Sequence, residues 1–411
     1  MASISPFAAY RYTAKAGRLE DLVTQPYDKI TPEMQARYLA RSPYNLVRII
    51  LGERFPEDND RDNVYTRAQQ YLNDWTGAGI LAADAGPSIY AYSQEFTPPD
   101  SHAPLVRKGF IALGGVEDYG AGVVHRHEET LAGPKKDRLE LLRATRAHFG
   151  QIFMLYPDPE LAIEGLLDSA AASDAAEITD EYGTVHRVSR ISDARVTGCV
   201  QQLMSGKQLL IADGHHRYET ALAFRNENPD VPGARKVMMT FVNMHSPGLR
   251  ILATHRVIRN LPRVDGGELL RETSARELAS LDELKEIFSR PAPDRLRIGI
   301  AFPNPSRAYL IDRPRRRGEL DVQTLHGEIL GGVLKIDREA VRNESYLQYV
   351  RGIDAAVAAL ENPGAQVAFL LEPTTIQQVA DVAFSGGVMP QKSTDFYPKL
   401  LSGLTVYKVD Q

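Results

Sequence analysis

The hydrophobic and polar positions of this chain alternate between helical and strand periods. Thr31-Pro32 has the residues of a helix start, because threonine caps a helix and proline suits its first turn, and we expect that helix to reach Arg41. Val64–Gly77 carries apolar and aromatic residues at helical spacing and ends in glycine. Between them, the apolar run Asn45–Leu51 predicts a buried strand.

The middle of the chain has mainly strand character. Ser88–Phe96 and Arg107–Val116 are rich in β-branched and aromatic residues, and a polar, proline-containing turn between them predicts a β-hairpin. A helix over Leu139–Phe149 and a strand over Gln151–Tyr156 follow. Three more strands are expected at Gln208–Ala212, Lys236–Met244 and Ile251–Val257.

A composition change near Leu261 predicts a separate C-terminal unit. It contains expected helices and strands in alternation: helices at Gly267–Leu278, Leu281–Phe288 and Ala355–Leu360, and strands at Leu296–Phe302, Ala308–Ile311 and Gln366–Leu371. This alternation favours a mixed α/β (α+β) fold over a helix bundle or a β-sandwich. We expect three parts: residues 1–97, a catalytic core over 98–260, and a C-terminal α/β domain over 261–411.

Composition narrows the functional classes. The chain has 411 residues and a formal net charge of -5, which argues against a nucleic-acid-binding surface over the whole molecule. Cys199 is the single cysteine, so neither an internal disulfide nor a cysteine-rich metal site can form. The N-terminus lacks signal-peptide character, and no apolar stretch approaches the roughly 18 residues of a membrane span. We therefore expect a cytoplasmic protein without membrane or nucleic-acid partners.

The strongest chemical signal is Asp213-Gly214-His215-His216-Arg217, which we call the His-rich turn. It joins a short buried strand to a helix, and the N–H groups at such a helix start bind anions readily. Two histidines and an arginine add donors, and Arg217 could grip phosphate in a bidentate fork. The alternative is that Asp213 merely caps the helix and the histidines lie at the surface. Adjacent histidines are poorly spaced to chelate a metal together. We favour a phosphate site.

A second cluster, His125–Thr130 followed by Gly133–Arg138, is dense in acidic and basic groups. Glu128 or Glu129 could accept a proton from a hydroxyl nucleophile. Lys135, Lys136 and Arg138 could neutralise charge on a transferring phosphoryl group. The alternative is a solvated, charged loop that leads into the next helix.

Two further stretches carry weaker signals. Pro26-Tyr27-Asp28 is an aromatic and acidic turn, as consistent with a structural role as with a functional one. Met389–Lys399 contains Lys392, Ser393 and Thr394 and could close over an anion, although a capping tail explains it almost as well. The glycine pairs of the chain match neither a Walker A loop nor a dinucleotide fingerprint.

These motifs together resemble a widespread prokaryotic family, domain of unknown function 1015. The resemblance rests on Gln25-Pro26-Tyr27-Asp28, on the segment His125–Thr130, on Asp213–Thr220 and on Gln391–Thr394, and it spans nearly the whole chain. The His-rich turn is also similar to the phosphate-holding turn of free serine kinases of the ParB/sulfiredoxin-like superfamily. This likeness implies a ParB/sulfiredoxin-like core with additional N- and C-terminal α/β segments.

The likeness also implies chemistry. In those kinases a glutamate of a His-Glu pair activates the serine hydroxyl, so Glu128, next to His127, inherits the role of general base. His215, His216 and Arg217, with Gly214, would hold nucleotide phosphates, and Asp213 would orient the turn or help to place Mg²⁺. Lys135 and Arg138 would stabilise the developing charge. Substrate contacts are expected from Asp28, His127, Glu129, Lys392, Ser393 and Thr394.

The leading hypothesis is a Mg²⁺-dependent kinase that uses ATP or ADP to phosphorylate the hydroxyl of a small polar metabolite, with free L-serine the first candidate. One alternative is a phosphoester hydrolase in which the same histidines and acids activate water. Another is a nucleotide-binding switch related to the partition proteins, which the absence of a basic footprint argues against. Whether the chain forms a homodimer stays open.

Overall fold

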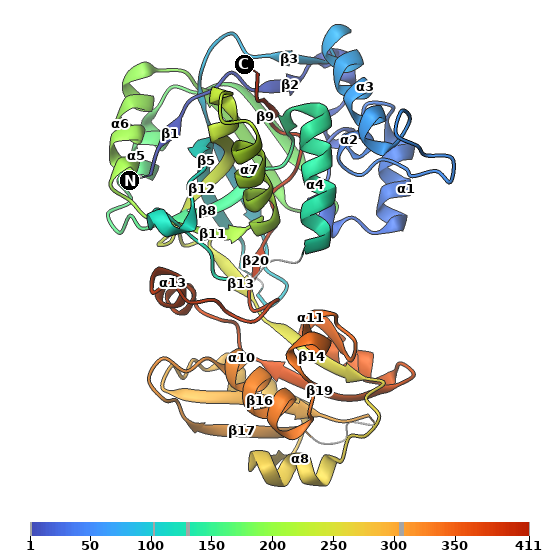
Figure 1. Cartoon of the computed structure of the whole chain (residues 1–411). Coiled ribbons are helices and arrows are strands. Elements are labelled where there is room, and N and C mark those ends of the chain that lie inside the picture. Colours follow the sequence, from blue (N-terminus) through green and yellow to red (C-terminus); the bar gives the residue numbers. More distant parts are fainter. Residues whose placement is uncertain (1, 102, 129–131, 304–307, 411) are drawn as a thin grey trace. The chain divides into compact units, whose positions relative to one another are not determined.

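The computed structural model describes residues 2–101, 103–128, 132–303 and 308–410 and divides into two compact units (Figure 1). The first unit comprises Met1–Arg126, Thr130–Leu249 and Pro398–Gln411, and the second comprises His127–Glu129 and Arg250–Tyr397. Both units combine helices with β-sheets, so the expected mixed α/β class is confirmed. Each unit is described by itself below.

A large mixed sheet forms the centre of the first unit. Its strands follow the order β6-β11-β8-β12-β5-β4-β10-β9, with β1 paired to β5. The bounds are β1 (Ile4–Ser5), β4 (Ile89–Phe96), β5 (Leu105–Gly115), β6 (Val124–His125), β8 (Ile152–Tyr156), β9 (Ser173–Thr179), β10 (Val185–Ile191), β11 (Leu209–Asp213) and β12 (Lys236–Asn243). The predicted hairpin is confirmed, because β4 and β5 pair antiparallel. Strand β12 pairs parallel with β8, and β11 pairs parallel with β6.

The helices of the first unit cover this sheet and build a second apolar cluster. They are α1 (Pro32–Arg41), α2 (Val47–Ile50), α3 (Val64–Gly77), α4 (Ala132–Thr145), α5 (Ala162–Ser169), α6 (Ala194–Ser205) and α7 (His215–Glu227). Helices α4 and α7 pack against each other (Figure 1). Trp75 of α3 is buried in the second cluster together with Leu46 and Ile49. The core therefore anchors both the N-terminal helices and the strands that end near the His-rich turn.

Sequence predictions for this unit hold for α1 and α3 but not throughout. Thr31 caps α1 by accepting a hydrogen bond from the N–H of Met34, as its residue type suggested. The predicted strand Asn45–Leu51 is wrong: the segment contains helix α2, and the Asn45 side chain accepts a hydrogen bond from the N–H of Val47 at 2.9 Å. A short apolar run suits a buried helix as well as a buried strand, so this pattern does not distinguish the two.

The C-terminus returns to the first unit instead of ending in the second. Strand β21 (Tyr407–Lys408) pairs with β7 (Ala147–His148), and β2 (Tyr10–Tyr12) pairs with β3 (Leu81–Ala83). Residues 1–97 and 98–249 share one core, since Ile4 and Ile89 pack in the same cluster as Met154 and Ile211. The compact units thus have bounds other than those of the three expected segments.

The second unit has its own sheet, in the order β15-β17-β16-β19-β14-β18. The bounds are β14 (Thr254–Arg259), β15 (Arg276–Leu278), β16 (Arg295–Ala301), β17 (Ala308–Pro314), β18 (Leu347–Arg351) and β19 (Ala365–Leu371), and a separate pair joins β13 (Arg250–Leu252) to β20 (Asp395–Tyr397). The helices are α8 (Gly266–Thr273), α9 (Leu281–Ser289), α10 (Asp321–Thr324), the π-helical η6 (Leu325–Val333), α11 (Arg338–Arg342), α12 (Ile353–Ala358) and α13 (Ile376–Phe384). In neither unit does a described helix combine the length and the apolar character that crossing a membrane requires.

Candidate functional site

The His-rich turn lies where the buried strand β11 ends and helix α7 begins. Gly214 occupies the N-cap position with φ of 93°, a left-handed conformation that glycine adopts without strain. A Cβ atom at this position would also lie 3.0 Å from Nε of Arg217. Because glycine has no side chain, it cannot cap the first N–H groups of α7, which is the condition for an anion site at a helix start.

Asp213 is held between two cations instead of capping the helix. Its Oδ2 accepts a hydrogen bond from Nη2 of Arg217 at 2.8 Å, and its Oδ1 lies 3.4 Å from Nζ of Lys399. Burial alone would raise the pKa of Asp213, but the charges of Lys399, Arg217 and Lys29 outweigh it and lower the pKa well below its usual range. Asp213 is therefore a carboxylate that gathers positive charge at the turn.

The two histidines of the turn occupy different environments. His215 is buried at 9% exposure, whereas His216 is partly exposed. Arg217 donates through Nη1 to the backbone carbonyl of Gln151, in addition to its bond with Asp213. These two contacts fix the plane of the Arg217 guanidinium and leave three of its five N–H donors for other acceptors.

The N-terminal turn at Tyr27 belongs to the same neighbourhood. A short 3-10 helix covers Tyr27–Lys29, and it contains Asp28, whose carboxylate lies 3.8 Å from the ammonium of Lys29. Burial raises the pKa of Tyr27, as does Asp28, and the charges of Arg138 and Arg217 oppose this rise. These couplings show that the Gln25–Asp28 motif and the His-rich turn, far apart in sequence, meet in the first unit.

Lys135 and Arg138 of α4 are both engaged in contacts within the first unit. Lys135 forms an ion pair with Glu219 of α7, and Arg126 also approaches Glu219, at 3.6 Å. The guanidinium of Arg138 stacks on the ring of Tyr27, 4.2 Å from the ring centroid, and donates to the carbonyl of Ile50 at 2.7 Å. Arg138 thus anchors the Tyr27 turn to α4.

Two site residues escaped the sequence reasoning: Lys29 and Lys399. Lys399 is positioned through its backbone, since its carbonyl accepts a hydrogen bond from Nε2 of Gln94 at 2.8 Å. The carbonyl of the preceding Pro398 accepts from Nη2 of Arg107, a fully buried arginine whose guanidinium lies 4.7 Å from the ring centroid of Phe153. Lys399 lies inside the stretch Met389–Lys399, and Lys29 directly follows the Gln25–Asp28 motif, but nothing in the local pattern ties either lysine to Asp213.

Glu128 belongs to the second unit, where it is attached to the 389–394 loop. Its Oε1 accepts a hydrogen bond from the N–H of Lys392 at 2.8 Å, and the carbonyl of His127 accepts from the N–H of Met389 at 2.7 Å. Nε2 of His127, which is fully buried, lies 2.8 Å from Oγ1 of Thr394. The loop therefore fixes both the backbone and the carboxylate of the His-Glu pair.

The other predicted residues of this loop have structural contacts. Ser393 is buried, and its hydroxyl donates to the carbonyl of Pro390. Lys392 is exposed and has a φ of 58°. Glu129, the remaining predicted substrate contact, lies outside the described residues. The structure thus brings His127, Glu128 and the 389–394 loop together in one unit, and Asp28, Lys135, Arg138 and the His-rich turn together in the other.

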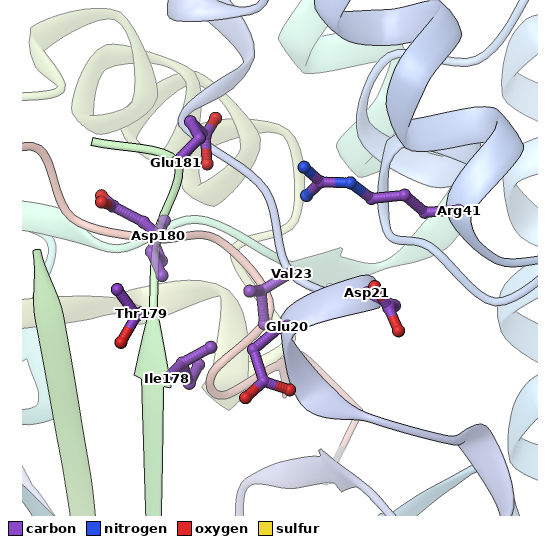
Figure 2. Close-up of a pocket in the computed structure, with 9 residues that line it drawn as sticks. Glu20, Asp21, Val23, Arg41, Ile178, Thr179, Asp180 and Glu181 are labelled. Carbon is purple, nitrogen blue, oxygen red and sulfur yellow. The ribbon is translucent and has the colours of Figure 1, made fainter. Parts of the chain in front are cut away.

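The first unit also contains a cavity of about 300 Å³. Figure 2 shows the residues that line it, and none of them is a predicted site residue. Its charged lining consists of four carboxylates and one guanidinium: Glu20, Asp21, Asp180, Glu181 and Arg41. Burial would raise the pKa of Asp180, but its hydrogen bond with His186 lowers it. A wall of this charge repels phosphate groups, so the cavity is unsuited to the anion predicted for the His-rich turn.

No cluster of three or more metal-binding side chains occurs in the part of the chain that the structure describes. Asp213 is the carboxylate that the His-rich turn offers to a cation, and both of its oxygens already have positively charged partners. If an Mg²⁺ ion binds at this turn, most of its ligands would therefore come from the phosphates of a bound ligand and not from the protein.

Comparisons with known proteins find similar solved structures and a matching family model. Solved structures with a similar arrangement include a conserved hypothetical protein from Pyrococcus furiosus, at 12% identity and a TM-score of 0.37 over 70% of this chain and 93% of that one. A free serine kinase variant in complex with ADP has 11% identity and a TM-score of 0.36, over 69% of this chain and 89% of that one. SbnI from Staphylococcus aureus, truncated at its C-terminus, has 12% identity and a TM-score of 0.36 over 71% and 85% of the two chains.

Among curated proteins, none matches the chain. The family model described as "Protein of unknown function (DUF1015)" matches residues 4–327, a stretch that includes the Tyr27 turn, Glu128 and the His-rich turn. A match over most of the 411 residues shows that the chain belongs to the DUF1015 family.

Proposed function

We propose that this protein is a nucleotide- and Mg²⁺-dependent kinase that phosphorylates the hydroxyl of a small polar metabolite, with free L-serine as the first candidate. The observation that carries the proposal is the start of α7. Gly214, the N-cap of this helix, makes no side-chain cap hydrogen bond, and Lys29, Arg217 and Lys399 act on the carboxylate of the preceding Asp213. Helix dipole, N–H groups and surplus positive charge together favour a phosphate group there.

The proposed reaction needs a base for the acceptor hydroxyl, and Glu128 takes that role by its resemblance to the glutamate of free serine kinases. As the acceptor oxygen bonds to the terminal phosphorus, its proton moves to the Glu128 carboxylate. The bond between that phosphorus and the bridging oxygen breaks, and its electron pair leaves with the nucleotide. The hydrogen bond from the N–H of Lys392 supports this assignment, because it orients the carboxylate.

The Mg²⁺ of the proposal supplies charge neutralisation between the transferring and leaving phosphates. Asp213 would complete its coordination only by releasing Arg217 or Lys399, its partners at 2.8 and 3.4 Å. The released side chain would then be available to phosphate oxygens. The proposal thus makes Asp213 an organiser of the turn that exchanges its partners when nucleotide binds.

The direct test is to incubate the purified protein with ATP or ADP, Mg²⁺ and L-serine, and to follow phosphoserine by mass spectrometry. Glu128→Gln should lower kcat by about 100-fold or more with little change in nucleotide affinity, because general-base catalysis contributes that much. Lys399→Met should weaken nucleotide binding, whereas the control Lys207→Met, which removes a lysine paired with Asp158 at 3.1 Å, should not.

Two results would contradict the proposal. A panel of hydroxy compounds that gives no nucleotide-dependent product removes its main support. Release of inorganic phosphate without any phosphorylated acceptor would instead indicate the hydrolase alternative. Equal activity of wild type and Glu128→Gln would remove Glu128 from the reaction while leaving the kinase assignment intact.

A further inference from the structure

Arg256 is a buried cation in the interior of the second unit. It lies on β14, between β18 and β19, and is 1% exposed. Burial lowers the pKa of Arg256 to about 10, which still leaves the guanidinium charged at neutral pH. Taking a charge out of water costs several kcal/mol unless its donors are satisfied. An arginine in this place therefore needs acceptors from the surrounding chain.

Backbone carbonyls of the 389–394 loop provide those acceptors. Nη2 of Arg256 lies 3.0 Å from the carbonyl of Lys392 and 3.5 Å from that of Gln391. Nη1 donates to the carbonyl of Thr254, and the Tyr349 ring lies 5.2 Å from the guanidinium carbon. The buried guanidinium thus holds the loop to β14 in addition to the bonds that the loop makes for itself.

Lys392 forms hydrogen bonds with both Arg256 and Glu128. Lys392 accepts from Arg256 through its carbonyl and donates to Oε1 of Glu128 through its N–H, at 2.8 Å. Its φ of 58° is left-handed, a conformation that a non-glycine residue keeps only when its surroundings enforce it. Both peptide groups of this strained residue are therefore tied down, one to the buried cation and one to the carboxylate.

We propose that Arg256 is the positioning residue for Glu128: it fixes the 389–394 loop in the conformation that presents the Lys392 N–H to the carboxylate. The effect on catalysis rests on the proposed function, whereas the effect of Arg256 on the conformation of the 389–394 loop does not. If Arg256 merely filled space in the sheet, its loss would weaken the whole unit without singling out this loop.

The variants are Arg256→Gln and Arg256→Lys, with Arg259→Gln as the matched control. Arg259 lies on the same strand, is partly exposed, and has Gln348 as its neighbour at 3.4 Å. Lysine keeps the charge but replaces the two separate donors, Nη1 and Nη2, that Arg256 uses for Thr254 and Lys392 with a single ammonium. The full chain is used throughout, and Arg256→Lys serves as the test if Arg256→Gln does not fold.

The first measurement is hydrogen exchange of peptides that cover residues 386–396. Exchange of the Lys392 amide should accelerate about tenfold or more in Arg256→Gln, because a hydrogen bond to a charged group is lost or weakened, and less in Arg256→Lys. Arg259→Gln should leave it unchanged. Unaltered exchange in both Arg256 variants, or equal acceleration over the whole second unit, would overturn the inference.

The second measurement is steady-state phosphotransfer. A misplaced base should lower kcat about 10- to 100-fold and leave KM for the nucleotide nearly unchanged, with Arg256→Lys recovering part of the loss. Normal kcat in variants with accelerated loop exchange would overturn the link to catalysis. A wild-type protein without phosphotransfer refutes the proposed function instead, and the exchange experiment then still decides whether Arg256 positions Glu128.

Discussion

Replacement of Gly214 by alanine perturbs the His-rich turn at its most constrained point. The backbone there has a φ of 93°, and the new Cβ would lie 3.0 to 3.1 Å from Nε, Cζ and Nη2 of Arg217. The guanidinium has little room to yield, because it donates to Asp213 at 2.8 Å and also to the carbonyl of Gln151. We therefore expect backbone strain and the loss of a charge-assisted hydrogen bond together.

The two costs can be estimated separately. A left-handed conformation costs a residue with a Cβ atom about 1–2 kcal/mol. The hydrogen bond between Arg217 and Asp213 involves two charged groups, and such bonds contribute about 1.5–3 kcal/mol. Since relaxation of the side chain recovers part of either cost, Gly214→Ala should lower the free energy of unfolding of the first unit by about 2–4 kcal/mol.

Urea unfolding followed by tryptophan fluorescence measures this change. Trp75 is the one tryptophan of the chain and is buried in the first unit, so its signal reports that unit alone. At a slope of about 2 kcal/mol per molar urea, within the usual range of about 1–3, the midpoint should fall by about 1–2 M.

The matched control is Gly165→Ala in the interior of α5, where a Cβ atom would meet nothing within 4 Å. Alanine is the better helix former, so this variant should be as stable as wild type or up to about 1 kcal/mol more stable. A Gly214→Ala protein that unfolds at the wild-type midpoint would refute the description of the turn as closely packed and open only to a residue without a Cβ atom.

Three further predictions concern pH. The pKa of Asp213 is lowered in the folded protein, so its carboxylate stabilises the fold above its usual pKa, and this stabilisation is lost in acid. Asp213→Asn should therefore destabilise the first unit at pH 7, and progressively less toward pH 3, as measured by urea titration. Burial raises the pKa of Glu372 to about 7 despite Arg297, so ionisation opposes folding as pH rises from about 4.5 to 7. Glu372→Gln should accordingly slow hydrogen exchange in β16 and β19 at pH 8 but not at pH 4. Burial lowers the pKa of His148 to about 4, so proton uptake by His148 favours the unfolded state between about pH 6.5 and 4. His148→Phe should therefore reduce the fall in melting temperature between pH 7 and pH 5.

Local chemistry made much of this fold predictable. The N-terminal cap of α1 and the hairpin of β4 and β5 are each encoded within a few residues, and the structure confirms them. The structure also confirms that the His-rich turn joins a short buried strand, β11, to a helix, α7. The segment that forms α2 is predicted as a strand instead, because a short apolar run shows no periodicity that distinguishes a helix from a strand.

Buried arginines mark the limit of pattern-based reasoning. Arg107 and Arg256 lie on strands that the sequence predicts, yet both are 1% exposed, whereas arginine is usually a surface residue. What allows their burial is a set of backbone carbonyls from distant segments: Pro398 for Arg107 and Lys392 for Arg256. No residue near either arginine in the sequence indicates that those carbonyls will accept its hydrogen bonds.

The charge of the His-rich turn is likewise assembled from separate parts of the chain. Arg217 comes from the turn itself, Lys29 from the N-terminal 3-10 helix, and Lys399 from the returning C-terminus, 186 residues from Asp213. A local motif can reveal a glycine that leaves a helix uncapped and an arginine four residues beyond the aspartate. It cannot reveal how many cations the fold adds, and an uncapped helix start becomes a strong anion site only with such charge beside it. The motif therefore predicts the position of the proposed anion site, and the fold determines how much positive charge lies beside it.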